Sequence, residues 1–443
     1  MSETGRSATA EETEVGSYFV ANYPPFSAWT SEHVETDALP ALAAKPVDTP
    51  LGLYLHIPFC RKRCHFCYFR VYTDKNASEV QAYLDVLARE WELYAAQPAI
   101  AGRPLDFVYF GGGTPSFLSV RQLESLVTRL TATTPWSTAE EVTFECEPGT
   151  LTEPKLAAIR ALGVTRLSLG VENFDDHILE LNGRAHRSAE IFRAYTYARS
   201  IEFPQINIDL IAGMLGETDE NWSQCIKRTL ALEPDSITIY QMELPFNTTI
   251  SSDVLKGTGQ FQEGVATWST KRRWVDEAFA EFERAGYTIG SAYTAVKDPG
   301  TTKFIYRDRL WQGADLAGLG VASFGHINGV HMQNLDSWGP YAAAVNEGRL
   351  PLHRAYRPTD EERLIREVVL QLKLGTIRPS YFREKYGVDI EARFSDALDS
   401  LRADGFLAGA NGDRLSLTRS GLLRIDSLLP RFFLQQHSDI RYT

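Results

Sequence analysis

Three cysteines lie within one short stretch of the chain, and their spacing indicates a metal centre. Cys60, Cys64 and Cys67 follow the apolar segment 53–57 in the pattern C-x3-C-x2-C. Thiolates are soft ligands that suit iron–sulfur clusters. A structural zinc ion usually takes four ligands in two pairs, and no second pair of cysteines follows here. We therefore expect a [4Fe–4S] cluster held by three cysteines, with one iron left free to bind a cofactor or substrate.

Glycines and carboxylates recur where apolar segments end. The run GGGTPS (111–116) directly follows an apolar segment, and glycines let the backbone approach a ligand closely. Glu145 and Glu147 are two residues apart, so they share one face of the strand expected there. Asp209 lies inside an apolar segment, where a carboxylate needs a partner or a shifted pKa. These groups are candidates for binding the polar parts of a cofactor.

The cysteine spacing, the string YLHIPFC and the later string YFGGGTPS together resemble the radical S-adenosylmethionine (SAM) enzymes. Within them, the chain is similar to the subgroup around oxygen-independent coproporphyrinogen III oxidase, and the similarity covers residues 51–435. The resemblance implies a [4Fe–4S] cluster ligated by Cys60, Cys64 and Cys67, and one or two molecules of SAM, of which one chelates the open iron. The residues that it assigns to SAM binding are Tyr54, Phe66, Gly112, Gly113, Thr114, Glu145, Glu172, Arg184, Asp209 and Ile327.

Two departures from the oxidase pattern bear on the reaction. Glu172 stands where the oxidase has glutamine, and an ionised carboxylate only accepts hydrogen bonds whereas an amide also donates them. Tyr68 and Phe69 follow Cys67, whereas the oxidase has a glycine and a further cysteine. The relatives that methylate or cyclopropanate substrates, and the haem chaperones, also lack that cysteine. Because the Glu172 carboxylate cannot donate as the amide does, it puts in doubt whether a second SAM is held as in the oxidase.

Three functions follow from the resemblance. The first is a coproporphyrinogen III dehydrogenase-like oxidoreductase of porphyrin and haem metabolism, in which SAM cleavage supplies a 5′-deoxyadenosyl radical. The second is a radical SAM methylase or cyclopropanase that uses two SAM molecules in a biosynthetic pathway. The third is a haem chaperone. The substrate is then a tetrapyrrole or a natural-product intermediate, and the electron donor a protein such as flavodoxin or ferredoxin.

Further polar residues lie near these motifs. The segment 305–334 resembles the part of the oxidase that closes the barrel, and its His326, His331 and Gln333 are either structural or face the substrate. Four cationic residues flank the cluster ligands and either remain solvated, offset the cluster charge, guide an electron donor or bind a substrate carboxylate: Arg61, Lys62, Arg63 and Arg70.

The bulk composition excludes several classes of protein. The 443 residues carry a net charge of −12, which gives no electrostatic support to a nucleic-acid partner. We find no apolar run long enough to span a bilayer and no signal peptide, so we expect no membrane partner. The chain has five cysteines, a number that fits metal ligation in a reducing cytoplasm. Cys146 and Cys225 are expected to be buried apolar residues.

The order of segments from residue 51 onward predicts the element that positions these motifs. Apolar segments alternate with helical patterns, which favours a parallel α/β sheet. We expect strands at 53–57, 106–110, 142–147, 166–171, 206–211 and 236–241, and helices at 78–95, 120–133, 154–162, 188–200, 219–231 and 265–286. The resemblance implies that they form a partial (β/α)6 TIM-like barrel, whose sites lie at the carboxyl ends of the strands.

We divide the chain into three parts. Residues 1–50 are expected to hold a disordered tail (1–17), an aromatic arm (17–29) that straps the barrel or covers the site, and a linker. Residues 51–350 form the barrel with its closing segment. Residues 351–443 form a winged-helix-like α+β module with a hairpin turn at Asn411–Gly412. Its helix 389–404 is too acidic to bind DNA, so we expect the module to cap the substrate or to pack against the barrel.

Overall fold

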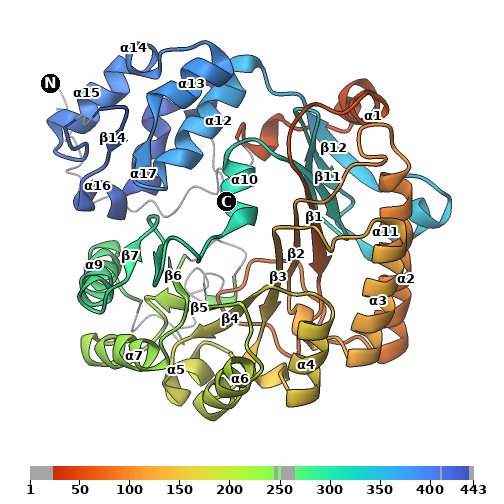
Figure 1. Ribbon diagram of the computed structural model, residues 1–443, viewed down its shortest axis with the longest axis horizontal. Coiled ribbons are helices and arrows are strands. Elements are labelled where there is room, and N and C mark those ends of the chain that lie inside the picture. Colours follow the sequence, from red (N-terminus) through yellow and green to blue (C-terminus); the bar gives the residue numbers. More distant parts are fainter. Residues whose placement is uncertain (1–22, 244–247, 251–264, 410–411, 439–443) are drawn as a thin grey trace, which may run out of the picture.

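The computed structural model describes residues 23–243, 248–250, 265–409 and 412–438 (Figure 1). The disordered tail expected at 1–17, the first part of the aromatic arm and Asn411 of the expected hairpin turn lie outside the described residues. Among the helices of the described part, none is both long and apolar enough to cross a membrane.

Six parallel strands alternate with helices, as the sequence predicts. The strands are β1 (Leu51–Ile57), β2 (Phe107–Gly112), β3 (Glu141–Cys146), β4 (Arg166–Glu172), β5 (Gln205–Ala212) and β6 (Ser236–Gln241), and they pair in this order. The helices between them are α2 (Ala77–Ala95), α3 (Val120–Thr133), α4 (Glu153–Ala161), α5 (Asp176–Leu181), α6 (Ser188–Ser200) and α7 (Asp219–Leu232). All the strands therefore end on the same side of the sheet, which is where α/β proteins place their sites.

Further strands extend the sheet at both edges. Next to β1 lie β9 (Asp315–Leu319), β10 (Phe324–Ile327), β11 (Val330–Asn334) and β12 (Leu352–Tyr356), of which β9 is parallel to β1 and the others alternate in direction. Next to β6 lie β8 (Thr294–Val296) and β7 (Thr288–Ile289), which follow helix α9 (Trp268–Arg284). The segment expected to close the barrel therefore continues the sheet from β1, beyond helix α10 (Ile305–Trp311).

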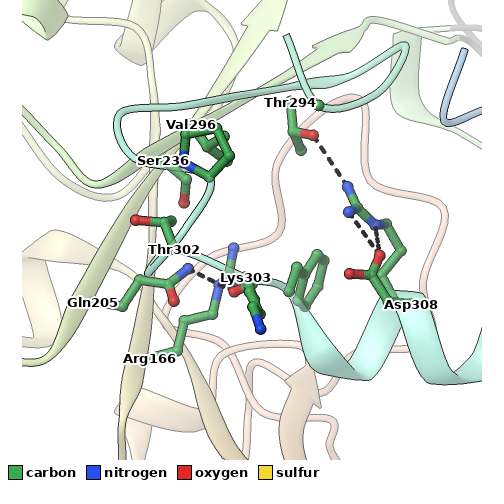
Figure 2. Close-up of a pocket in the computed structure, with 12 residues that line it drawn as sticks. Arg166, Gln205, Ser236, Thr294, Val296, Thr302, Lys303 and Asp308 are labelled. Carbon is green, nitrogen blue, oxygen red and sulfur yellow. Dashed lines mark hydrogen bonds and ion pairs between the residues drawn. The ribbon is translucent and has the colours of Figure 1, made fainter. Parts of the chain in front are cut away.

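The loop before α10 crosses the other end of the sheet. The side-chain amide of Gln205, at the start of β5, donates to the carbonyl of Lys303 at 2.9 Å, and Lys297 N–H donates to Asp235 O at 2.9 Å. These bonds hold the loop against the amino ends of β5 and β6, and Figure 2 shows the one from Gln205. This end of the barrel is the one opposite the cysteine loop.

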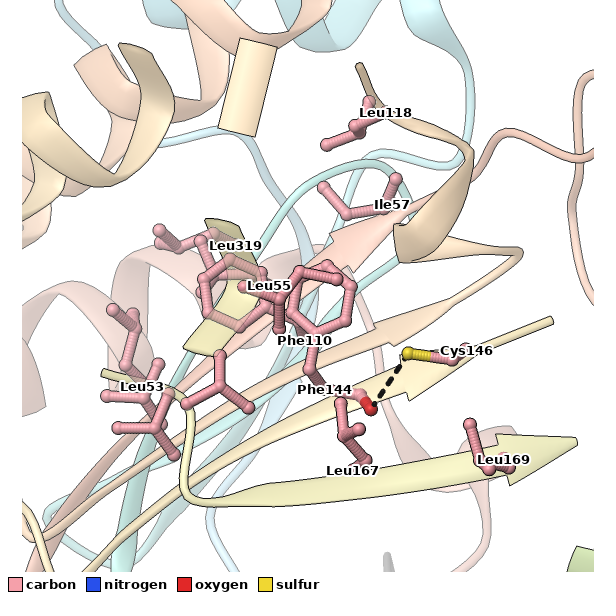
Figure 3. Packing of buried hydrophobic residues seen from close by; sticks show 14 of the residues in the cluster. Leu53, Leu55, Ile57, Phe110, Leu118, Phe144, Cys146, Leu167, Leu169 and Leu319 are labelled. Atoms are coloured by element: carbon pink, nitrogen blue, oxygen red, sulfur yellow. Dashed lines mark hydrogen bonds between the residues drawn. The ribbon is translucent and has the colours of Figure 1, made fainter. Parts of the chain in front are cut away.

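The core lies where the strands are covered on both faces. The seven residues of β1 are buried except the half-buried Tyr54, a pattern typical of parallel strands under helices. Side chains of five neighbouring strands pack together (Figure 3): Leu53, Leu55, Ile57, Phe110, Phe144, Leu167, Leu169 and Leu319. Capping boxes at Asn76 and Ser119 begin α2 and α3. The core thus fixes the strand ends from which the site residues project.

The region before the barrel differs from the expected linker. Residues 34–43 form two short helices, Val34–Ala38 and Leu39–Ala43, and Ala41 and Leu42 are buried. Pro40 lies in the first turn, where its missing N–H costs no hydrogen bond. The described part of the aromatic arm straps the sheet, because Phe26 stacks on Phe324 and Trp29 on His331.

The C-terminal part has a hydrophobic cluster of its own, formed mainly by residues between 364 and 432. Its elements are α12 (Asp360–Leu372), β13 (Thr376–Ile377), α13 (Pro379–Tyr386), α14 (Ile390–Arg393), α15 (Ser395–Ala403), β14 (Leu415–Ser416), α16 (Arg419–Leu423), α17 (Ile425–Leu428) and α18 (Gln435–Ser438). The single helix expected at 389–404 is divided at Phe394, whose ring is buried and packs against Phe432. The order of helices and the β13–β14 pair agree with a winged-helix-like arrangement.

Candidate functional site

The cysteine loop leaves the carboxyl end of β1 and folds back on itself. Cys60 N–H donates to Tyr72 O at 3.1 Å, and Cys67 N–H donates to Cys64 O at 3.1 Å. Burial raises the pKa of Cys60 to about 11 and also raises that of Cys67. The thiols also lie close enough together for the negative charge of neighbouring thiolates to raise these pKa values further. A bound metal cluster must therefore supply the positive charge that deprotonates them.

The glycine run lies directly under the first cysteine. Gly113 N–H donates to Ile57 O at 2.8 Å, and a Cβ at Gly113 would lie 3.0 Å from Cys60 Sγ. The hydroxyl of Thr114 donates to Cys60 Sγ at 3.3 Å. In the described part of the chain, no three His, Cys, Asp or Glu side chains converge as they would on a single metal ion. Ligands at three corners of a cube need not converge, so the thiols fit a cluster better than one ion.

Arg184 connects the cysteine loop to the carboxyl end of β4. Its Nη1 donates to Cys64 Sγ at 3.4 Å, its Nη2 donates to Gly170 O at 2.6 Å, and Nη2 lies 3.5 Å from Glu172 Oε1. Burial disfavours the charged guanidinium, but the neighbouring Cys64, Glu172 and Glu147 raise the pKa of Arg184 well above its ordinary value. Arg184 therefore stays cationic beside the sulfurs, where it offsets the negative charge of a thiolate-bound cluster.

Glu172 adopts a backbone conformation that is unusual for a glutamate. Its φ is +63°, and the pairing register between β4 and β5 shifts between Gly170 and Glu172. A non-glycine residue in this region costs about 1–3 kcal/mol, and such residues gather at functional sites. Burial raises the pKa of Glu172 to about 7, against the opposing effect of Arg184. The irregularity aims the carboxylate at Arg184 rather than along the strand.

Two further carboxyl groups lie in the same electrostatic neighbourhood as Glu172. Tyr109 OH donates to Glu145 Oε1 at 2.6 Å, and Ser168 Oγ donates to Asp209 Oδ2 at 2.8 Å. Burial raises the pKa of Glu145 to about 7 and raises that of Asp209. The predicted residues Glu145, Glu172 and Asp209 are thus brought together, but the ion pair considered for Asp209 and Arg184 forms between Glu172 and Arg184 instead.

Two buried nitrogen atoms of this site have hydrogen-bonding capacity to spare. Within the described residues, His56 Nε2 and Arg184 Nε are buried without a hydrogen-bond partner. A Cβ at Gly112 would lie 2.7 Å from the His56 ring, and Tyr54 OH lies 3.4 Å from His56 Nδ1. Tyr240, at the end of β6, is 51% exposed. Spare polar groups beside three thiols fit a cluster together with a polar cofactor.

One anchor of the cysteine loop escaped the sequence reasoning. Glu147 Oε1 accepts from Arg61 Nη2 at 3.0 Å, and His186 Nδ1 lies 3.2 Å from the same oxygen. Burial alone would raise the pKa of Glu147, but His186, Arg184 and Arg61 lower it to about 2. Glu147 is therefore ionised and ties the cysteine loop to the end of β3. It does not take part in the group of carboxyl residues that contains Glu145. Arg61 and Glu147 are 86 residues apart, so no local pattern links them.

The aromatic residues of the loop take two different environments. Phe66 packs into apolar clusters that contain Met214, Met242 and Leu215, so it anchors the loop in the core. Tyr68 and Phe69 are 42% and 45% exposed, with ring centroids 4.6 Å apart. The predicted SAM contact Phe66 is thus at the site but mostly used in packing.

The structure does not bring Ile327 to this site. Ile327 is fully buried in the main core. Because β10 runs antiparallel to β9 and His326 pairs with Leu316 near the start of β9, later residues of β10 lie farther from the strand carboxyl ends. The polar groups considered beside it are also in use. His326 Nδ1 lies 3.0 Å from His331 Nδ1, and Gln333 Oε1 accepts from Arg354 Nε at 2.6 Å.

The cysteines outside the loop are structural, as expected. Cys146 and Cys225 are 4% and 2% exposed. All five cysteines are free thiols.

Comparison with known proteins agrees with this geometry. The model of the radical SAM superfamily matches residues 54–228. Oxygen-independent coproporphyrinogen III oxidase from Synechocystis is 26% identical, over 94% of this chain and 92% of that protein. Heme chaperone HemW from Bacillus subtilis is 28% identical, over 84% and 96%. The structure of coproporphyrinogen III oxidase (HemN) from Escherichia coli superposes with a TM-score of 0.80 at 25% identity, over 95% of this chain and 96% of that chain.

The parallel barrel, the three-cysteine loop and the family match define a radical SAM domain over residues 54–228. Over most of its length the chain is similar to oxygen-independent coproporphyrinogen III oxidase.

Proposed function

We propose that this chain is a radical SAM oxidoreductase of the coproporphyrinogen III oxidase type that acts on a tetrapyrrole. The observation that carries the proposal is the double contact of Arg184, which joins Cys64 in the cluster loop to Glu172 at the carboxyl end of β4. The cluster loop and the polar residues at the strand ends are thereby coupled in one site. Relatives that match more than nine-tenths of the chain support the choice of reaction.

The described residues divide the work of this site. When bound, the [4Fe–4S] cluster and SAM supply a 5′-deoxyadenosyl radical that abstracts hydrogen from the substrate. Cys60, Cys64 and Cys67 would hold the cluster, and the backbone of Gly112 and Gly113 together with Thr114 would form the adjoining wall. The carboxylates of Glu145 and Asp209 would accept hydrogen bonds from hydroxyl or amino groups of SAM. Tyr54 contacts His56 and Tyr109, and its ring lies beside that of Tyr109, which bonds Glu145.

We further propose that residues 351–443 cap the substrate, while residues 51–350 form the barrel and 1–50 the arm. The separate hydrophobic cluster of the C-terminal part supports this division. Lys373 pairs with Asp426 at 2.8 Å, and Tyr293 OH, from the segment before β8, donates to the same Asp426. The module is thereby held against the barrel through the strand next to β6, the strand that carries the exposed Tyr240.

The exposed face of the cysteine loop is our proposed docking site for an electron donor of the flavodoxin or ferredoxin type. Tyr68 and Phe69 are exposed there, and Lys62 and Arg63 flank the cluster ligands. These donor classes are acidic, so opposite charges would favour the encounter. Because an iron–sulfur enzyme with free cysteines needs a reducing environment, we also propose that the protein acts in the cytoplasm.

Three observations favour two other functions, methylation or cyclopropanation and haem transfer. The carboxylate of Glu172, which replaces an amide, and the Tyr68–Phe69 pair favour a methylase or cyclopropanase that uses two SAM molecules. The similarity to a heme chaperone favours haem transfer.

The test is an anaerobic assay of the reconstituted protein with SAM, a reductant and coproporphyrinogen III. The proposal predicts 5′-deoxyadenosine and release of CO2 from the substrate. S-adenosylhomocysteine as a product would indicate methylation instead, and the absence of 5′-deoxyadenosine would favour the chaperone.

A pair of cysteine variants checks that the products come from this site. Cys64→Ala removes a cluster ligand and is expected to abolish 5′-deoxyadenosine formation. Cys225→Ala removes a buried thiol in α7, outside the site, and is expected to keep it. Equal activities of the two variants would contradict the assignment of the site.

A further inference from the structure

A cavity of about 290 Å³ lies at the end of the barrel opposite the cysteine loop (Figure 2). It is lined by the first residues of three parallel strands, Arg166 of β4, Gln205 of β5 and Ser236 of β6. Arg166 and Glu172 are the two ends of β4, and six residue steps along a strand span about 20 Å. The cavity is therefore separate from the proposed cluster and SAM site.

Arg166 is the unusual residue of this cavity. It is 2% exposed, and its Nε and Nη1 are buried without a hydrogen-bond partner among the described residues. Within the same residues, no carboxylate lies near enough to form an ion pair with it. The centre of its guanidinium lies 4.1 Å from the centre of the Phe304 ring. This contact holds the guanidinium in place, but the ring accepts no hydrogen bond from N–H groups that point along the guanidinium plane. Buried guanidinium donors without acceptors are rare and call for an unseen partner.

Two further cations border the same space. Lys303 is exposed, and the bond from Gln205 to its carbonyl fixes its backbone at the rim. Arg307 lies 5.7 Å from the Phe304 ring, so two guanidinium groups flank this ring. The lining contains one carboxylate, Asp308, and Arg307 already pairs with it at 2.7 Å. The charges of Arg166 and Lys303 therefore remain available to a ligand.

A purely structural role accounts for part of this arrangement. Arg166 lies near enough to Glu141, Glu145 and Asp209 to lower the pKa values that burial raises. These carboxylates, however, already bond to other donors; Glu141, for example, accepts from the backbone N–H groups of Ile305 and Tyr306. Attraction over a distance balances charge, but it does not provide acceptors for the N–H groups of Arg166.

We propose that this cavity is a second ligand site, which binds a small molecule through a carboxylate or phosphate group. The oxyanion would accept from Arg166 and Lys303, and Thr302 and Ser236 line the space beside it. Guanidinium groups bind both oxyanions through paired N–H donors. The inference goes beyond the proposed reaction and does not depend on it.

The test is isothermal titration calorimetry of the full chain at constant ionic strength, with inorganic phosphate and malonate as separate probes. Wild type is expected to bind at least one probe saturably at one site, and the stronger probe distinguishes phosphate from carboxylate ligands. Arg166→Gln is expected to abolish binding. Lys303→Gln, which alters an exposed side chain, is expected to weaken it about tenfold, which corresponds to about 1.4 kcal/mol.

The control is Lys227→Gln, at an exposed lysine of α7 that does not line the cavity. It is expected to bind like wild type. Should Arg166→Gln fail to fold, Lys303→Gln against Lys227→Gln decides the matter. The proposal is overturned if wild type binds neither probe, or if Lys303→Gln binds as well as Lys227→Gln.

Discussion

Single residues set the electrostatic character of the cluster site. Arg184, whose side chain is 12% exposed, contacts both a thiol and a carboxylate, and the hydroxyl of Thr114 donates to the Cys60 sulfur. Hydrogen bonds and positive charges at cluster sulfurs stabilise the more negative, reduced cluster. These two side chains therefore tune how readily the cluster accepts an electron.

We predict that Thr114→Val lowers the reduction potential of the cluster. Valine keeps the shape of threonine but removes the O–H that donates to Cys60 Sγ. Redox titration followed by electron paramagnetic resonance measures the shift. Thr229→Val is the matched control, since the buried hydroxyl of Thr229 donates to the carbonyl of Cys225, outside the cluster loop. An equal potential in both variants would show that the Thr114 bond does not act on the cluster.

A buried carboxyl group gives a second prediction at this scale. Burial raises the pKa of Glu217 from 4.5 to about 8, although it accepts from Gly213 N–H, Met214 N–H and the Asn173 amide. The folded chain thus binds this proton more tightly than the unfolded chain. The stabilisation is full below pH 4.5 and is lost as pH rises towards 8.

Glu217→Gln is therefore expected to flatten the fall in melting temperature between pH 5 and pH 8. The carbonyl oxygen of glutamine can still accept from Gly213 N–H and Met214 N–H, whereas the bond from Asn173 is lost, and glutamine cannot ionise. Thermal unfolding followed by circular dichroism across this range measures the slope. Glu124→Gln, at an exposed position of α3, should leave the slope of the wild type, and an unchanged slope in Glu217→Gln would refute the prediction.

At the scale of elements, the cysteine loop and the loop after β2 fit against each other closely. A Cβ at Gly113 would meet Cys60 Sγ and the carbonyl oxygens of Ile57 and Phe59, each at 3.0 Å. Two of these three atoms belong to the backbone, so side-chain rotation cannot relieve the contact. A side chain at this position would therefore force the two loops apart by a few tenths of an ångström.

We predict that Gly113→Ala displaces the cysteine loop and loses most of the bound iron. The measurement is the content of iron and sulfide after anaerobic reconstitution. Gly339→Ala is the control, because a Cβ at Gly339 meets no atom within 4 Å, and it should load like wild type. Full loading of Gly113→Ala would mean that the loop adapts and that the close fit is not required.

The same scale shows why some residues could be predicted from the sequence and others could not. Cys60, Cys64, Cys67 and the glycine run follow strands directly, so the parallel order of β1 and β2 brings them together. Ile327 was wrongly placed because counting along 305–334 does not reveal that β10 turns back from the strand ends. The anchor formed by Arg61 and Glu147 depends on tertiary contact, which no local spacing encodes.

For the whole molecule, hydrophobic periodicity predicted the six parallel strands and the change of character after residue 358. It missed the short helices at 34–43, because proline and polar residues there are typical of a linker while burial against the barrel decides the structure. The φ of +63° at Glu172 was also beyond prediction, since it arises from the register shift between β4 and β5. Patterns predict elements, and packing then sets the details of the site.

The central claim is that Cys60, Cys64 and Cys67 hold a [4Fe–4S] cluster whose open iron binds SAM. The most direct measurement is the electron paramagnetic resonance spectrum of the reconstituted, reduced protein before and after SAM is added. The account predicts the signal of a reduced [4Fe–4S] cluster whose line shape changes on addition of SAM. A spectrum without a cluster signal, or a cluster signal that SAM leaves unchanged, would contradict it.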